Sequence, residues 1–308
     1  MNTMTATGAR AARPRAWTKL ADVVSRWAFM GPAAVILAAM LAYPIFYTIE
    51  ISFSRFDLMT FSAVEWIGWE NYAHVLDDYR FWSSMKVTLI YLAFALPIQI
   101  ILGFGIAFLI NADWRGRGTI RALFIIPMVV APVVAGGIWR MILDPLWGIM
   151  NWLIGLFGFA PLDWFGDPNL AMAAIVIIDT WRWTPFVVLI ATAALLSLPR
   201  DLFEAAEIDG ANWWSMLWSI TLPLLVPIIA ATFVVRWLGA VKMFDIALAA
   251  TYGGPGGATN VINLFIYEEA FRSLRFAESA AMAVIVLVLT MVLTGVFLLG
   301  TRKLEGRY

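Results

Sequence analysis

The sequence contains no cysteine and a single histidine, His74, among its 308 residues. Disulfides, thiol nucleophiles and zinc sites built from cysteines or several histidines are therefore excluded. A nucleotide-binding P-loop is excluded as well, because it needs a glycine directly before its lysine. The four lysines of this chain follow Thr18, Met85, Val241 and Arg302. The chain is thus not expected to hydrolyse ATP by itself.

Charge is also scarce. Charged residues make up 14% of the chain and hydrophobic residues 62%, whereas an ordinary soluble domain has about 25% charged residues. The formal net charge is zero, so nothing indicates a nucleic-acid partner. A chain of this composition is expected to be solvated mainly by lipid.

Long apolar segments take the place of the missing charge. A membrane-spanning helix needs about 20 apolar residues to cross roughly 30 Å of hydrocarbon. Six predicted spans meet this length: residues 27–53, 87–110, 119–143, 170–196, 222–251 and 279–300. The first is too long for a signal-peptide core and lacks an Ala-x-Ala cleavage site, so it is predicted to be retained. The predicted fold class is therefore all-α, a polytopic membrane protein with six transmembrane helices.

A seventh apolar segment, residues 145–159, is too short to span the membrane. It is predicted to form an interfacial or re-entrant helix on the outer side, with Trp147 and Trp152 at the depth of the lipid headgroups.

The distribution of charge along the chain predicts its orientation. Basic residues gather before the first span, between the second and third, and after the sixth: Arg10, Arg13, Arg15, Lys19, Arg26, Arg115, Arg117, Arg121, Arg302, Lys303 and Arg307. Acidic residues gather in the alternate loops: Asp57, Glu65, Glu70, Asp77, Asp78, Asp163, Asp167, Glu268, Glu269 and Glu278. The positive-inside rule then places both termini in the cytoplasm. We expect a disordered basic tail over residues 1–26, a membrane domain over 27–303 and a short tail over 304–308.

A polar cytoplasmic loop, residues 197–223, separates the fourth and fifth predicted spans. Asp201 is predicted to cap a short helix, with Glu204 three residues further on. Gly210 is predicted to end that helix in the left-handed conformation, and residues 211–220 to resume as a helix before Pro223. The mixed acidic, small and apolar residues suit docking into a groove on another protein. A solvated amphipathic connector is the alternative.

The spacing within this loop resembles a known family. Glu204-Ala205-Ala206, Gly210 three residues beyond, and then Ile220-Thr221-Leu222-Pro223 resemble the cytoplasmic EAA loop of permease subunits in ATP-binding-cassette (ABC) importers. Three further stretches resemble the carbohydrate-uptake branch: residues 143–152, residues 241–259 with Gly-Gly-Pro-Gly-Gly at 253–257, and residues 266–271. Residues 249–252, Ala-Ala-Thr-Tyr, depart from the Leu-Thr that many relatives have there.

The resemblance implies an inner-membrane permease subunit of a binding-protein-dependent importer for a sugar, oligosaccharide or polyol. The implied partners are a second homologous permease, two ATPase subunits, an extracytoplasmic solute-binding protein, the carbohydrate and membrane lipid. ATP and Mg would bind the ATPase subunits, so this chain is expected to hold no cofactor, no metal and no catalytic residue. The resemblance places ATPase coupling on Glu204, Ala205, Ala206, Asp209, Gly210 and Ala211.

Polar and tryptophan side chains within the predicted spans are candidates for the substrate path: Gln99, Asp179, Trp181, Arg182, Trp183, Arg236, Trp237, Lys242 and Asp245. Charges at such positions usually face a protein interior or a water-filled cavity. In one interpretation, Asp179 with Arg182 and Lys242 with Asp245 form i,i+3 ion pairs that hold helices together. In the other, these residues line a cavity where a sugar stacks on an aromatic ring and binds polar groups through its hydroxyls.

Two rival functions remain open at this point. An intramembrane enzyme would have only Asp179 and Asp245 as candidate catalytic groups, with no recognisable protease context around them. A secondary transporter or channel for a polar solute is the stronger rival, because buried acids and arginines also suit proton coupling. The energy source separates these possibilities, since only the importer requires ATP.

Overall fold

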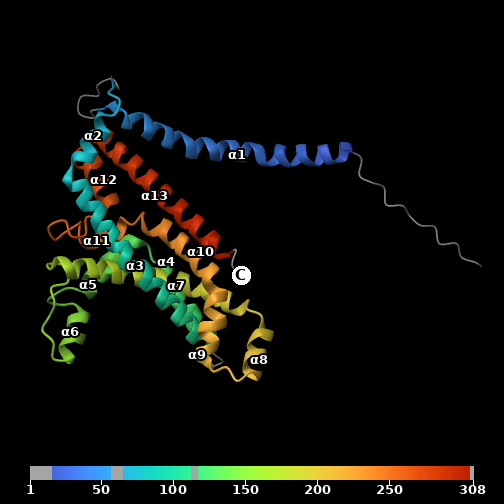
Figure 1. The fold of residues 1–308 in the computed structure, drawn as a ribbon. Helices are drawn as coiled ribbons and strands as arrows, with labels where there is room; N and C mark the ends of the chain where they lie inside the picture. The colour runs from blue at the N-terminus through green and yellow to red at the C-terminus, as the bar shows by residue number, and fades with distance from the viewer. Residues whose placement is uncertain (1–15, 57–64, 112–116, 306–308) are drawn as a thin grey trace, which may run out of the picture. The chain divides into compact units, whose positions relative to one another are not determined.

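The computed structural model describes residues 16–56, 65–111 and 117–305, which are almost entirely helical (Figure 1). The chain divides into two compact units, residues 1–50 and 51–308. The first unit consists of most of helix α1 (Ala16–Ser52), whose stretch Met30–Ser52 is long and apolar enough to cross a membrane. Residues 16–26 of the predicted tail therefore belong to this helix, and residues 1–15 lie outside the described residues.

Five helices meet the length and composition of a membrane span, or six when one bent pair counts as a single span. Besides α1, they are α3 (Tyr79–Asn111), α7 (Pro168–Leu196), the continuous helix Trp213–Ala240, and α13 (Phe276–Glu305). This agrees with the predicted all-α fold of six spans. Helix α13 extends into the predicted C-terminal tail, of which residues 306–308 lie outside the described part.

The predicted third span is not one helix. The segment 119–143 divides into α4 (Arg117–Val129) and α5 (Pro132–Ile142), which are bent by 102° at the break. Pro132 has no N–H to continue the helical ladder, and it disfavours the helical conformation of the residue before it. Ala131 accordingly adopts φ −59° and ψ 139°. The prediction of a continuous span here is wrong, and Pro132 lies at the break.

The fifth span also differs from its predicted bounds of 222–251. Helix α10 (Leu222–Ala240) ends early, and a turn separates it from the short helix α11 (Asp245–Ala250). At the other end, helical structure begins at Trp213, through α9 (Trp213–Met216) and a π-helical turn η1 (Leu217–Thr221). Pro223 follows shortly after the π-helical turn and does not end this helical run.

Short elements fill the remaining connections. Strands β1 (Ser54–Arg55) and β2 (Glu65–Trp66) pair antiparallel, and α2 (Glu70–Asp77) precedes α3. Helix α6 (Ile149–Leu156) forms within the segment where an interfacial helix is predicted, and α12 (Ile262–Phe271) precedes α13. Residues 57–64 and 112–116, which include the predicted loop charges Asp57 and Arg115, lie outside the described residues.

The core of the second unit forms where α3 and α7 pack together. Gly103 of α3 permits the close approach, because a methyl group at this position would collide with the side chain of Val187. Ala107 of α3 and Ala191 of α7 are fully buried in the same apolar cluster. Small residues at a helix interface are the usual means by which membrane helices approach closely.

Candidate functional site

The polar loop of residues 197–223, which we call the acidic loop, forms the helix, glycine turn and second helix that the sequence predicts. Helix α8 (Arg200–Ile208) ends at Gly210, which adopts φ +78°. The N–H of Gly210 donates to the carbonyl of Glu207 at 3.0 Å, and the N–H of Ala211 donates to that of Ala206 at 2.9 Å. These two bonds define a Schellman motif. The predicted role of Gly210 as the left-handed terminating residue is confirmed.

The start of α8 differs from the prediction. Pro199 occupies the N-cap position, and no side chain caps this end of the helix. Asp201 lies two residues beyond the N-cap position, so the predicted capping pair with Glu204 is wrong. Its carboxylate is still placed in the turn where the helix dipole favours negative charge.

Helix α8 buries none of its own residues. Glu204, Ala205 and Asp209 are exposed, and Ile208 leaves 86% of its surface accessible. The loop has four acidic residues: Asp201, Glu204, Glu207 and Asp209. None of them forms an ion pair with a residue that the structure describes. A short amphipathic helix in water gains most of its stability by packing an apolar face. Ile208 is thus an exposed apolar side chain beside acids that have no ion-pair partner among the described residues.

A buried polar network joins three of the membrane helices. In α7, Asp179 Oδ2 accepts hydrogen bonds from the Tyr91 hydroxyl at 2.6 Å and from Gln99 Nε2 at 2.8 Å, both on α3. Arg236 of α10 lies 3.3 Å from the same oxygen through Nη2, and its Nε donates to Gln99 Oε1 at 2.9 Å. Its guanidinium carbon lies 4.2 Å from the ring centroid of Trp183.

This network corrects one predicted pairing. Asp179 and Arg236 are only 2% and 1% exposed, and their ion pair crosses between helices. Arg182, the predicted i,i+3 partner of Asp179, instead donates through Nε to the carbonyl of Val130 at 3.1 Å. Val130 lies in the break between α4 and α5, where backbone carbonyls have lost their helical partners. Arg182 thus donates a hydrogen bond to a backbone carbonyl at the break. The Asp179 carboxylate receives its hydrogen bonds from Tyr91, Gln99 and Arg236 instead.

Tyr91 completes the network and is absent from the sequence-based candidates. It lies eight residues before Gln99, a spacing that keeps both side chains on one face of a helix. That spacing, together with the rarity of polar groups in the second span, is the signal by which the sequence could identify it.

The other candidate path residues lie elsewhere. Trp237 donates through Nε1 to Thr294 Oγ1 of α13 at 3.2 Å. Lys242 is exposed in the turn after α10, and Asp245 is half-buried in the first turn of α11. No ion pair joins these two residues within the described part of the chain, so the predicted Lys242–Asp245 pair is wrong. Of the nine candidates, four come together in the network: Gln99, Asp179, Trp183 and Arg236.

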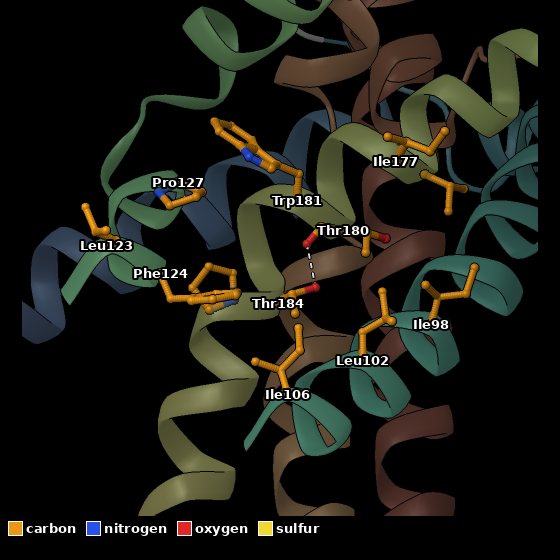
Figure 2. Close-up of a pocket in the computed structure, with 12 residues that line it drawn as sticks. Ile98, Leu102, Ile106, Leu123, Phe124, Pro127, Ile177, Thr180, Trp181 and Thr184 are labelled. Atoms are coloured by element: carbon orange, nitrogen blue, oxygen red, sulfur yellow. Dashed lines mark hydrogen bonds between the residues drawn. The ribbon is translucent and has the colours of Figure 1, made fainter. Parts of the chain in front are cut away.

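A large cavity lies beside the network, between α3, α4 and α7. Its volume is about 740 Å³, and its walls are mostly apolar (Figure 2). Trp181 is the one predicted path residue that lines it, and the Trp181 ring also meets Trp139 edge-on at 5.8 Å. Thr180 and Thr184 supply hydroxyls; Thr184 donates to the Thr180 carbonyl at 2.7 Å, whereas Thr180 Oγ1 has no partner among the described residues. An apolar space with few polar groups and one indole ring is typical of a small-molecule site.

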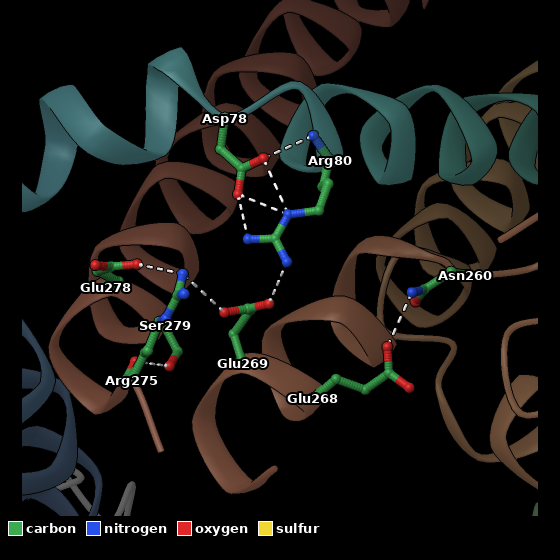
Figure 3. A network of polar contacts seen from close by, with 8 residues as sticks. All are labelled: Asp78, Arg80, Asn260, Glu268, Glu269, Arg275, Glu278 and Ser279. Atoms are coloured by element: carbon green, nitrogen blue, oxygen red, sulfur yellow. Dashed lines mark hydrogen bonds and ion pairs between the residues drawn. The ribbon is translucent and has the colours of Figure 1, made fainter. Parts of the chain in front are cut away.

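A second polar network lies at the start of α3, beside α12 and α13 (Figure 3). Arg80 binds Asp78 at 2.8 Å and Glu269 of α12 at 3.0 Å, and Arg275 approaches Glu269 at 3.5 Å. Burial acts to raise the pKa of Asp78, but the hydrogen bonds and charge of Arg80 outweigh it, so the pKa lies below 3.8. The network fixes the start of α3 to the junction of α12 and α13.

Residues 88–305 match the model of one protein family, the binding-protein-dependent transport system inner membrane component. The chain belongs to this family. The permease is 34% identical to the trehalose/maltose transport system permease protein of Thermococcus litoralis, over 87% of this chain and 90% of that protein. It is 32% identical to the sulfoquinovosyl glycerol transport system permease protein of Agrobacterium fabrum, over 92% of each chain. The predicted membership among the permease subunits of ABC importers is therefore confirmed.

The fold of the permease also matches that of a solved transporter. A chain in the crystal structure of a bacterial ABC transporter involved in alginate import superposes with a TM-score of 0.82, at 21% identity. The match covers 93% of the permease and 98% of that chain. The permease is thus a multi-pass inner-membrane transport component with the importer-permease fold.

Proposed function

We propose that the permease forms half of the translocation path of an ATP-driven, binding-protein-dependent importer for a sugar, oligosaccharide or polyol. Two relatives are named for trehalose/maltose and for sulfoquinovosyl glycerol, and both are similar over most of their length. The sequence at 253–257 and 266–271 supports the same carbohydrate branch. A secondary transporter or channel for a polar solute is the alternative function.

The observation that carries the proposal is the free surface of α8. Its acids have no basic partner in the described chain, Leu202 and Ile208 are exposed, and Gly210 forms the turn that ends it. We infer that α8 docks into a cleft of a separate ATPase subunit, with Glu204 pairing to a basic residue there. Ala205, Ala206, Asp209 and Ala211 would complete the contact. ATP and Mg would bind the ATPase, leaving this chain without a cofactor or metal.

Movement of α8 has a direct route into the membrane helices. After Gly210, helical structure runs without a break from Trp213 through η1 to the end of α10. Arg236 near that end is joined to α3 and α7 by the buried network. Helices α3, α7 and α10 would move together, because separating them would leave the buried charges of Asp179 and Arg236 without their ion-pair and hydrogen-bond partners.

The substrate would pass close to Trp181. Its indole ring offers a face for the apolar side of a sugar ring. The buried Asp179–Arg236 pair would act on transport by holding the helices around this cavity. Trp237, Lys242 and Asp245 would be more distant from the substrate.

The assembly that we propose contains a second homologous permease, two ATPase subunits and an extracytoplasmic solute-binding protein. Both termini would lie in the cytoplasm with α8, and the network around Arg80 would lie on the outer side.

The test compares two coupling variants with a matched control in the reconstituted importer. Glu204→Ala and Gly210→Val should each lower ATP-dependent uptake at least tenfold and weaken ATPase copurification, since a buried interface charge or the turn itself is lost. Glu207→Ala removes a neighbouring acid outside the motif and should retain most uptake. Normal uptake in both coupling variants, with normal membrane insertion, would contradict the coupling role.

A further inference from the structure

A smaller cavity lies where α8 meets the ends of the membrane helices. Its volume is about 310 Å³. We call it the α8 pocket; it is lined by Phe108, Asn111, Leu195, Leu196, Leu198, Arg200, Phe203, Trp213, Met216, Leu217 and Thr221. Figure 1 shows α8 and α9 together beside the end of α3 that lies farthest from α2. The pocket therefore lies at the ends of α3 and α7, two helices long and apolar enough to span a membrane, where we expect the lipid headgroups.

The lining of the α8 pocket is amphipathic. Aromatic, leucine and methionine side chains from α3, α7, α8, α9 and η1 form most of its wall. The polar groups are Arg200, Asn111 and Thr221, and the Thr221 hydroxyl is already used, because it donates to the Met216 carbonyl at 3.1 Å. Arg200 and Asn111 remain to bind a ligand.

Arg200 is positively charged and has no ion pair within the part of the chain that the structure describes. Glu204 lies one helical turn further along α8, at the i,i+4 spacing that permits a salt bridge, yet none forms. Arg200 instead lines the α8 pocket and stays exposed. An arginine that forgoes a nearby acid and stands beside an apolar wall favours an anionic group that carries an apolar part.

We propose that the α8 pocket binds an anionic phospholipid, with the headgroup phosphate on Arg200 and Asn111 and part of one acyl chain against the apolar wall. The positive charge of Arg200 favours a lipid of net negative charge over a zwitterionic one, and the apolar wall would be left uncovered by a free phosphate ion. Trp213, which is 55% exposed at the pocket, has the amphipathic ring that gathers at headgroup depth. Basic pockets between membrane helices are a known means of recognising anionic headgroups.

The proposed lipid would lie directly against α8 and η1, the elements that couple ATP hydrolysis to transport under the proposed function. Anionic lipid would then raise transport by holding α8 in its docked position. Only this effect on transport rests on the proposed function. Lipid binding itself is measured on the purified importer complex, without an uptake assay.

The experiment measures lipid retained by the purified importer complex in native mass spectrometry, after reconstitution in phosphatidylcholine with added phosphatidylglycerol. The wild type should retain phosphatidylglycerol in preference to phosphatidylcholine. Arg200→Gln should lower that retention about fivefold, the effect of one cation near an anionic lipid, and Arg200→Lys should keep most of it. Arg272→Gln, which removes an exposed arginine at the start of the α12–α13 turn, is the matched control and should leave retention unchanged.

Four outcomes would overturn the proposal. Equal retention of the two lipids by the wild type removes the anionic preference. Equal retention of phosphatidylglycerol by wild type and Arg200→Gln removes the site. Loss of the ATPase subunit from Arg200→Gln with unchanged lipid retention assigns Arg200 to the ATPase interface. Displacement of bound lipid by inorganic phosphate would identify a free anion as the ligand in place of the lipid. None of these results depends on the uptake assay that tests α8 coupling.

Discussion

Asp179 and Arg236 illustrate how single residues hold this permease together. A buried ion pair needs further hydrogen bonds to offset the loss of hydration. Here Tyr91 and Gln99 provide them, and the Trp183 ring covers the guanidinium. The pair therefore links α3, α7 and α10 with few unsatisfied groups.

We expect Arg236→Met to lower the unfolding free energy by about 3–5 kcal/mol, because it leaves the Asp179 carboxylate buried without its cation. The double variant with Asp179→Asn should recover much of this loss. Thermal unfolding in detergent measures both. Arg182→Met is the control, since it removes one hydrogen bond to the Val130 carbonyl and should cost less. An additive double variant would contradict direct coupling between the two residues.

Asp78 gives a prediction for pH. Its pKa is lowered in the folded state, so its contribution to stability is present above about pH 4 and is lost as the pH falls through the lowered value. Because Arg80 is partly exposed, the contribution should stay near or below about 1 kcal/mol. Asp78→Asn should lower stability at pH 7 and show a smaller loss between pH 5 and pH 3. Parallel melting curves for both proteins across this range would contradict the role of Asp78.

At the scale of elements, close packing of α3 on α7 depends on the absence of a side chain at Gly103. We expect Gly103→Ala to destabilise the permease by about 1–3 kcal/mol, because the added methyl overlaps Val187. Val187→Ala in the same chain should restore part of the stability, since it opens the space that the methyl needs. Melting temperatures of the two single variants and the double variant measure this.

Gly105→Ala is the matched control for that experiment. Gly105 lies in the same helix with nothing near the position of an added Cβ, so its substitution should be neutral or slightly stabilising. Equal destabilisation at both glycines would show that helix packing is not the cause.

The broken third span shows how an element departs from the simplest interpretation of its sequence. Residues 119–143 are apolar enough to read as one helix, yet Pro132 divides them, and Arg182 from α7 binds the carbonyl that the break exposes. Proline alone does not predict a bend, because α3, α7 and α10 each contain an internal proline and remain single helices. The bend of 102° depends on what the two halves contact.

At the scale of the whole molecule, the proposed importer predicts a strict energy requirement. Vesicles that contain the permease alone should show no uptake of trehalose or maltose under a proton or sodium gradient. Vesicles with the partner permease, the ATPase subunits and the binding protein should take up the cognate carbohydrate only with ATP. Gradient-driven uptake by the isolated permease would support the secondary-transporter alternative.

Several features of this permease follow from local sequence. The length of apolar segments determined the all-α fold of six spans, since crossing hydrocarbon requires a minimum run of apolar residues. The EAA spacing and Gly210 determined the helix and turn of the acidic loop, because both depend on residues within one or two helical turns. These features involve no distant contact, so they can be recognised without a structure.

Other features were decided by tertiary structure alone. The partner of Asp179 is Arg236, 57 residues away, and not the neighbouring Arg182. The cavity beside Trp181 and the pocket beside Arg200 each combine residues from three or more helices. The physical reason is that periodicity places a side chain on a face of its own helix, whereas packing decides which other helix that face meets.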